Sequence, residues 1–256
     1  MAEIYDTHAH YDDVRFDDDR HLLVSSLPLH GVGWVLSCAD SLESCRKVQA
    51  LAEAYPHVSA AFGIHPHNVH TVDWGTLEPE LRRFLAHPKC VCLGEIGLDY
   101  HYDFSPRDKQ RDLFARQLAL ANELDLPVSV HIREATADAL DILRRYQPRG
   151  VVHCFSGSLE TARTLLDWGM YLGFGGAVTF KGAVKPLAAA AFCPADRLLL
   201  ETDAPYMTPV PYRGRRCEST HIAHTAAKIA EVRGVSVDTI LDIARHNAQT
   251  LFRLPA

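Results

Sequence analysis

Short apolar runs alternate with amphipathic segments along the whole chain of 256 residues. Eight of these runs are rich in Val, Ile, Leu or Phe without strict polar alternation, the pattern of strands buried on both faces. The predicted strands cover residues 3–8, 33–38, 58–65, 91–98, 127–132, 150–155, 171–176 and 197–203. Helix-like segments separate them, so the order of elements predicts an α/β fold.

Serine N-cap candidates open three of the helix-like segments: Ser41, Ser105 and Ser158. Pro106 follows Ser105, which is a favourable first helical position. The last segment, residues 221–254, predicts two helices divided by Arg-Gly-Val-Ser. Eight strands alternating with helices in this length predict one (β/α)8 barrel domain over residues 1–256. The structural alternative is a doubly wound open sheet, and the missing Gly-rich dinucleotide fingerprint after the first strand weakens it.

Composition narrows the class of protein. Hydrophobic residues make up 47% of the chain and charged residues 23%, as in globular proteins with an ample core. No apolar run approaches the ~20 residues that span a bilayer, and the first strand leaves no room for a signal peptide. We therefore expect a cytoplasmic protein without membrane contact. Separately, we expect a monomer. The seven cysteines include no C-x-x-C pair, which predicts small buried side chains kept reduced.

Six potential metal ligands stand at the ends of predicted strands, starting with two histidines in Asp-Thr-His-Ala-His. His8 and His10 are alternate residues of a strand, so their side chains share a face. In a barrel, the carboxyl ends of the strands surround one cavity mouth. The same mouth receives the other four candidates, Glu95, His131, His153 and Asp203.

Four imidazoles and two carboxylates suit two divalent ions, with Zn²⁺, Mn²⁺, Mg²⁺, Co²⁺ or Ni²⁺ as candidates. Glu95 lies between glycines and is the natural carboxylate to bridge both ions. His8, His10 and Asp203 then complete the coordination of one ion, and His131 and His153 complete that of the other. Such a pair can activate water, with Asp203 as the general base that accepts its proton. Glu201 is expected to share the strand face of Asp203 and orient a ligand, or to be a structural barrel carboxylate.

Seven motifs, in order along essentially the whole chain, resemble the TatD family of metal-dependent hydrolases. They are DTHAH, GIHPH, GEIGLDY, VHIR, HCFSG, ETDAPY and NAQTLF. The resemblance implies a metal-dependent deoxyribonuclease, often a 3′-to-5′ exonuclease on single strands or 3′ ends. It also implies metal ligands at the same six positions. One loop departs from the family pattern, because Cys217 and Ser219 replace the usual Asn and Pro.

Other residues are candidates for substrate contact, each with a structural alternative. His65 can contact a phosphate or make a hydrogen bond that stabilises its loop. Arg133 can contact a phosphate or form an ion pair at the barrel rim. Backbone amides at Ser156 can cradle an anion, or form a strand-to-helix turn. Arg213 belongs to a basic cluster that can guide a nucleic-acid backbone or be a solvated loop. The aromatic residues Tyr100, Tyr102, Phe104 and Tyr206 are candidates for base stacking or for rim packing.

The net charge of −6 argues against a broad surface that coats nucleic acid, but not against a small phosphodiester pocket. Metal-dependent cleavage of DNA is therefore the leading hypothesis. The enzymatic alternative is hydrolysis of carboxylic esters, lactones or aminoacyl-RNA at the same site. Cyclic-amide hydrolases of the superfamily commonly use a carboxylated Lys where Glu95 stands, which disfavours that branch. A metal-stabilised scaffold protein is the non-enzymatic alternative.

Overall fold

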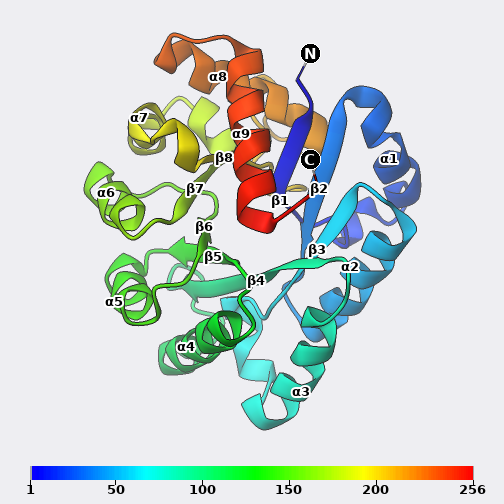
Figure 1. Cartoon of the computed structure of the whole chain (residues 1–256), viewed down its shortest axis with the longest axis vertical. Helices are drawn as coiled ribbons and strands as arrows, with labels where there is room; N and C mark the ends of the chain where they lie inside the picture. Colours follow the sequence, from blue (N-terminus) through cyan, green and yellow to red (C-terminus); the bar gives the residue numbers. More distant parts are fainter. Residues whose placement is uncertain (1, 256) are drawn as a thin grey trace.

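A computed structural model describes residues 2–255, and in this range eight parallel strands form one sheet in the order β1 to β8. The sheet curls into a nearly closed barrel with helices around it, so the predicted fold class is confirmed (Figure 1). The strands are β1 (Ile4–Ala9), β2 (Val32–Cys38), β3 (Val58–Phe62), β4 (Cys90–Asp99), β5 (Val128–Arg133), β6 (Gly150–Val152), β7 (Tyr171–Phe174) and β8 (Leu198–Leu200).

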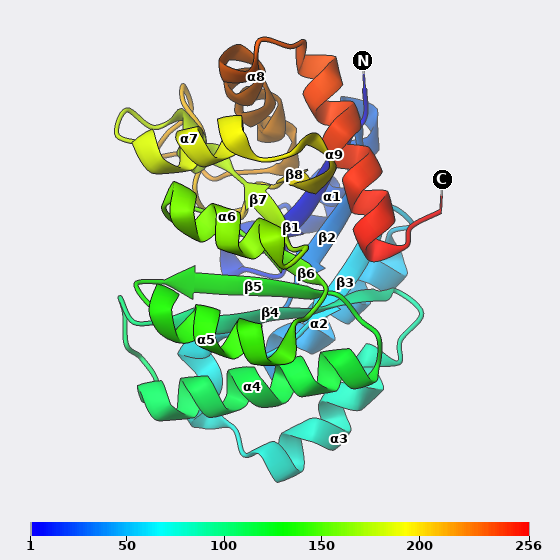
Figure 2. The ribbon, with the colours of Figure 1, turned by 60° about the vertical axis from the view of Figure 1, so that its left-hand side comes forward.

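Helices follow the strands and cover the outer face of the barrel; Figure 2 shows α4 and α5 beside β4 and β5. The helices are α1 (Arg20–Ser26), α2 (Leu42–Ala54), α3 (Trp74–Leu85), α4 (Arg107–Glu123), α5 (Thr136–Tyr146), α6 (Leu159–Asp167), α7 (Val184–Phe192), α8 (Ile222–Arg233) and α9 (Val237–Phe252). Among residues 2–255, no helix has the length and apolar character needed to cross a membrane.

The barrel closes where β1 meets the chain that follows β8. The Thr7 hydroxyl donates to the Leu200 carbonyl at 3.0 Å, and the backbone N–H of Asp203 donates to the His8 carbonyl at 2.9 Å. The N–H of His10 in turn donates to the Ala204 carbonyl at 2.6 Å. These bonds place the segment of Asp203 directly beside the two N-terminal histidines.

Two buried apolar clusters divide the core. One lies between the strands and the outer helices and includes Val35, Val152 and Leu200. Alternate strand residues, which face the barrel interior, form the other cluster together with the end of α9. It contains Trp34, Val151, Tyr171, Leu199 and Phe252 among others, and the rings of Trp34 and Phe252 lie 5.5 Å apart. The amino-terminal end of the barrel interior is therefore filled with apolar side chains.

Several sequence-based details need correction. The predicted strands 150–155 and 197–203 are too long, because Cys154 (φ 45°) and Asp203 (φ 59°) leave the extended conformation. Glu95 does not end its strand, since β4 continues to Asp99.

The helix N-termini agree with the sequence in two cases and not in the third. The hydroxyls of Ser41 and Ser158 cap α2 and α6 as predicted. Ser105 does not cap α4, because Pro106 occupies the cap position and the Ser105 hydroxyl donates to the His67 carbonyl. The final segment forms two helices, α8 and α9, as expected.

Candidate metal centre

Glu95 lies between two pairs of imidazoles at the carboxyl ends of the strands. Its Oε2 atom is 3.4 Å from His8 Nε2 and 3.4 Å from His10 Nε2, and these two nitrogens are 3.2 Å apart. Its Oε1 atom is 3.0 Å from His131 Nδ1 and 2.7 Å from His153 Nε2, which are also 3.2 Å apart. Each carboxylate oxygen thus faces its own pair of ring nitrogens.

A bulge in β4 aims Glu95 at these rings. Leu93 pairs with Val128 and Ile96 pairs with Val130, so a step of three residues on β4 lies opposite a step of two on β5. The extra residue redirects a side chain, as bulges do near functional sites. Gly97 (φ 146°) is required here, because a side chain at this position would come within 2.0 Å of the His131 carbonyl oxygen. The glycines around Glu95 therefore permit close backbone approach, as the sequence indicated.

The outward ring nitrogens of His8, His10 and His131 have hydrogen-bond partners, whereas His153 Nδ1 has none among the described residues. His10 Nδ1 is 2.9 Å from the Cys38 carbonyl, and His8 Nδ1 is 3.0 Å from the Ser129 hydroxyl. A carbonyl oxygen only accepts, so His10 Nδ1 carries a proton and its Nε2 is available as a ligand atom. Such outer contacts fix both the tautomer and the orientation of metal-ligating histidines.

Asp99 provides the outer contact for His131 and was not singled out from the sequence. Its Oδ2 atom accepts from His131 Nε2 at 3.1 Å and from His67 Nε2 at 3.0 Å, and the residue is 1% exposed. Its backbone is held by the buried Gln110 side chain, which accepts from the Asp99 N–H and donates to its carbonyl. The available signal was its place directly after the predicted strand 91–98, where the other candidate carboxylates and imidazoles were sought.

Asp203 and Glu201 approach the cluster from different directions. Asp203 Oδ1 lies 3.5 Å from His10 Nε2, whereas Glu201 Oε1 lies 3.6 Å from His153 Nδ1 and accepts from the Cys154 N–H at 2.5 Å. The expectation that they share a strand face is wrong, because β8 ends at Leu200. Gly173 makes room for Glu201, since a Cβ there would be 2.3 Å from its Oε2.

The histidines of the cluster differ in their pKa values: burial lowers those of His8 and His65, whereas His10 and His153 are shifted upward. Burial opposes protonation of His10, but the carboxylates of Asp203 and Glu95 outweigh it and raise its pKa well above the ordinary value. The pKa of His153 is likewise raised, against burial, by Glu95 and Glu201. Burial favours a neutral Glu95, yet the surrounding histidines hold its pKa well below the usual range. The carboxylates that favour a proton on His10 and His153 also favour a metal cation in its place.

The donor set fits divalent metal ions. Nitrogen ligands at about 2.0–2.1 Å from one zinc-like ion lie ~3.0–3.4 Å from each other, and both imidazole pairs here are separated by 3.2 Å. Imidazole with carboxylate is a combination that Zn²⁺, Mn²⁺, Co²⁺ and Ni²⁺ accept. Within the described residues, the sets that could hold an ion include His8 with His10 and Glu95, and His65 with Glu95 and His131. His65 Nε2 is 3.5 Å from Glu95 Oε1, so this buried ring lies next to the second pair.

A cavity of about 650 Å³ opens over the cluster. The predicted metal-ligand and phosphate-contact residues that line it are His10, His65, Glu95, His131, Arg133, His153 and Asp203. The stacking candidates Tyr102, Phe104 and Tyr206 also line it, together with Asp12, Asp13, Asp40, His67, Asp99 and Met207. His8 lies beneath it, fully buried. Ser156 and Arg213 do not line the cavity, and the Arg213 guanidinium instead lies 3.8 Å from the Phe180 ring centre.

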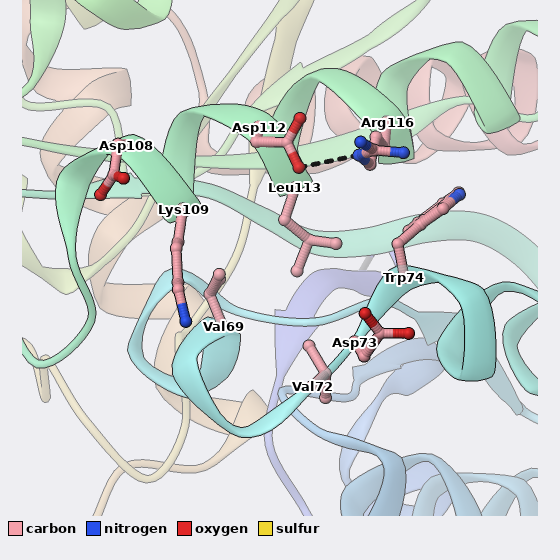
Figure 3. A pocket seen from close by; sticks show the side chains of 9 residues that line it. All are labelled: Val69, Val72, Asp73, Trp74, Asp108, Lys109, Asp112, Leu113 and Arg116. Carbon is pink, nitrogen blue, oxygen red and sulfur yellow. Dashed lines mark hydrogen bonds and ion pairs between the residues drawn. The ribbon is translucent and has the colours of Figure 1, made fainter.

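A second cavity, of about 410 Å³, lies between α4 and the start of α3 (Figure 3). It is lined by Val69, Val72, Asp73, Trp74, Asp108, Lys109, Asp112, Leu113 and Arg116. It contains no histidine, and Asp112 is paired with Arg116 at 2.8 Å. Of these two cavities, only the larger is lined by histidine side chains.

Comparison with known proteins agrees with this geometry. The family model described as TatD related DNase matches residues 5–253. The chain belongs to the TatD family. Members of this family are metal-dependent hydrolases, so the resemblance noted in the motifs is confirmed.

Three relatives define the similarity. The Bacillus subtilis protein named uncharacterized metal-dependent hydrolase YabD is 38% identical, over 98% of this chain and 99% of its own. The Pantoea vagans 3′-5′ ssDNA/RNA exonuclease TatD is 36% identical, over 98% of this chain and 100% of its own. The crystal structure of YJJV, a TatD homologue from Escherichia coli K12, superposes with a TM-score of 0.92 at 35% identity, covering 98% of both chains.

The two residues that depart from the TatD pattern are buried in this member. Cys217 and Ser219 are both 0% exposed. The Ser219 hydroxyl donates to Asp6 Oδ2 at 2.7 Å, and its N–H donates to the Tyr11 hydroxyl at 3.0 Å. A proline at this position would supply neither bond. The replacement therefore joins the loop to the carboxylate of Asp6, whose Oδ1 accepts from the backbone N–H of His8.

Five of the seven cysteines are buried as the composition predicted, and Cys90 and Cys154 are partly exposed. All seven are free in the described part of the chain. Burial raises the pKa of the Cys38 and Cys154 thiols well above the ordinary value, so both are protonated near neutral pH.

Proposed function

We propose that this TatD-family protein cleaves phosphodiester bonds of single-stranded DNA and removes nucleotides stepwise from the 3′ end. The observation that carries this proposal is the bipartite cluster around Glu95, which gives one carboxylate oxygen to each of two imidazole pairs. The relative named as a 3′-5′ ssDNA/RNA exonuclease, at 36% identity over the full length, supports the substrate and the polarity.

Two divalent metal ions would be held by six residues. His8, His10 and Asp203 would hold one ion, His131 and His153 would hold the other, and Glu95 would contribute to both. When bound, such ions polarise the phosphate and lower the pKa of the attacking water. The protein supplies the fixed directions of the ligands, through the contacts of His8, His10 and His131 with Ser129, Cys38 and Asp99.

Asp203 would accept the proton of the attacking water. Burial favours its neutral form, but the His10 contact and the other histidines hold its pKa below the ordinary value, so it is a carboxylate near neutral pH. Its side chain lines the cavity and keeps 17% exposure, which leaves it within reach of water and substrate. Arg133, at the rim of the same cavity, would meet a phosphate oxygen with its planar guanidinium. His65 would contact the reacting phosphate from its buried position beside Glu95.

The test uses purified protein, stripped of metal and reloaded with Mg²⁺, Mn²⁺ or Zn²⁺, on a single-stranded oligonucleotide labelled at its 5′ end. A ladder of products that shorten from the 3′ end is the expected result. Asp203→Asn should lose the ladder, and Asp108→Asn, on the exposed start of α4, serves as the matched control. Protein that binds metal but cleaves no oligonucleotide would overturn the proposal. An ester, lactone or aminoacyl-RNA substrate would then become the alternative to assay.

A further inference from the structure

Two exposed aromatic rings stand in the segment between β4 and α4, at the rim of the larger cavity. The rings of Tyr102 and Phe104 are stacked, with centres 5.2 Å apart and planes inclined by 15°. They are 48% and 61% exposed, although large aromatic side chains are normally well buried. Tyr100, two residues earlier, differs: its hydroxyl donates to Asp138 and it does not line the cavity. Tyr206 is also exposed (45%) and lines the cavity, but the Arg15 guanidinium lies over its ring, 3.9 Å from the ring centre. Exposure together with mutual stacking thus singles out Tyr102 and Phe104 among these candidates.

The carboxylate of Asp99 links this ring pair to the candidate metal centre through hydrogen bonds. The backbone N–H of Tyr102 donates to Asp99 Oδ1 at 3.0 Å, while Asp99 Oδ2 accepts from His131. The His67 ring, which also donates to Asp99, packs edge-on against Tyr102 and Phe104, at 5.4 and 4.9 Å between ring centres. The residue that orients His131 therefore also sets the position of the aromatic pair.

A cationic group lies next to the pair. The Arg133 guanidinium is 4.7 Å from the centre of the Tyr102 ring and lines the same cavity. A flat aromatic surface beside a guanidinium and a phosphate-activating centre matches one nucleotide, with its base on the rings and its phosphate near the cation. The chain as a whole carries a net charge of −6, so long-range attraction to nucleic acid is weak. Affinity for a strand must then come from local contacts such as stacking.

We propose that Tyr102 and Phe104 form a stacking platform for an unpaired nucleobase next to the scissile phosphodiester, and so determine the preference for single strands. This inference rests on the proposed nuclease function and deepens it, because it assigns the residues that recognise the substrate. Base pairing in a duplex would keep the base from reaching the rings. Stacking is tolerant of base identity, so the platform selects strandedness rather than sequence.

The test crosses enzyme variants with substrate variants. Phe104→Ala and Tyr102→Ala are assayed on an oligonucleotide with natural bases and on oligonucleotides with one abasic residue at each of the last three positions. We expect each variant to lose about tenfold or more in kcat/KM on the natural strand, and to lose little on the strand whose abasic site removes the stacked base. Phe104→Trp should retain its kcat/KM on the natural strand. Phe104→Leu, which is apolar but not aromatic, should show the same loss in kcat/KM as Phe104→Ala.

Phe192→Ala is the matched control, since Phe192 is also exposed (42%) but lies on α7, outside the cavity. Equal losses on natural and abasic strands, or no loss on either, would overturn the platform. A separate binding readout distinguishes this failure from failure of the nuclease proposal. In an Asp203→Asn background, fluorescence anisotropy of a labelled oligonucleotide should still show weaker binding when Phe104 is replaced by Ala. Binding of this kind without any cleavage by the wild type would retain the platform and reject the nuclease.

Discussion

The two ends of the barrel interior are built from the same strands but from opposite chemistry. On β6, Val151 belongs to the buried apolar cluster, and two residues later His153 contacts Glu95. In the same way, Leu199 of β8 is apolar, and Glu201, just past the strand end, faces His153. Alternate residues face the interior, so one step of two residues separates core from candidate site.

This difference shows where the folding free energy and the chemistry are located. The amino-terminal end is sealed by the last turn of α9, through the contact of Phe252 with Trp34. The carboxyl-terminal end has no such seal and opens into the 650 Å³ cavity. Buried charged and polar groups contribute little net stability, so the apolar end stabilises the fold on which the polar end is arranged. Variants of each end should therefore have separable effects.

The largest effect is expected at the polar end. His153→Ala removes a ring nitrogen 2.7 Å from Glu95 Oε1. Hydrolysis should fall at least about a thousandfold, because bound metal ions contribute several kcal/mol of transition-state stabilisation. Metal content measured by elemental analysis should fall with it. Full metal content with full activity would show that His153 is not a ligand.

Phe252→Ala tests the apolar end. The ring is 3% exposed, so its removal should lower the free energy of unfolding by about 3–5 kcal/mol. Denaturant unfolding of the metal-free protein measures this loss. The folded variant should bind metal as the wild type does, and a large loss of metal affinity would contradict the separation of the two ends.

Asp99→Asn tests the outer contact of the centre. An amide keeps one acceptor oxygen and places a donor where Asp99 now accepts from both His67 and His131. Metal affinity should weaken by about ten- to a hundredfold, as is typical for such partners. Competition with a chelator gives the affinity, and Asp108→Asn is the control. Unchanged affinity would remove Asp99 from the positioning role.

The smallest effect concerns pH. The Arg15 contact is the largest cause that lowers the pKa of Asp13, at the cavity rim, from 3.8 to about 2. Because the folded-state pKa is depressed, the pair stabilises the fold above about pH 4 and loses this contribution as pH falls toward 2.

Arg15→Gln should therefore lower stability near neutral pH by at most about 0.5 kcal/mol, since the pair is partly exposed. The difference from wild type should shrink as pH falls from 5 to 3, and the carboxyl resonance of Asp13 in NMR should titrate closer to 3.8. The loss in Phe252→Ala should not depend on pH in this way. A constant Arg15→Gln difference over this range would contradict the assigned pKa.

The sequence by itself determined the barrel, the order of its strands and the gathering of the six candidate ligands at one end. It could do so because apolar runs at strand length and polar residues at their ends are local properties, and parallel strands of a barrel share one carboxyl-terminal face. The TatD motifs were equally local, and the family is confirmed.

Only the tertiary structure decided how those residues meet. The bulge that turns Glu95 between two imidazole pairs depends on the register of β4 against β5, which no local pattern specifies. The contact of Asp99 with His131 joins residues 32 positions apart on neighbouring strands. The exposure of Tyr102 and Phe104 beside the same carboxylate also depends on packing between elements. Hydrogen-bond direction and solvent exposure arise from contacts across the chain, so they became visible only once the barrel was assembled.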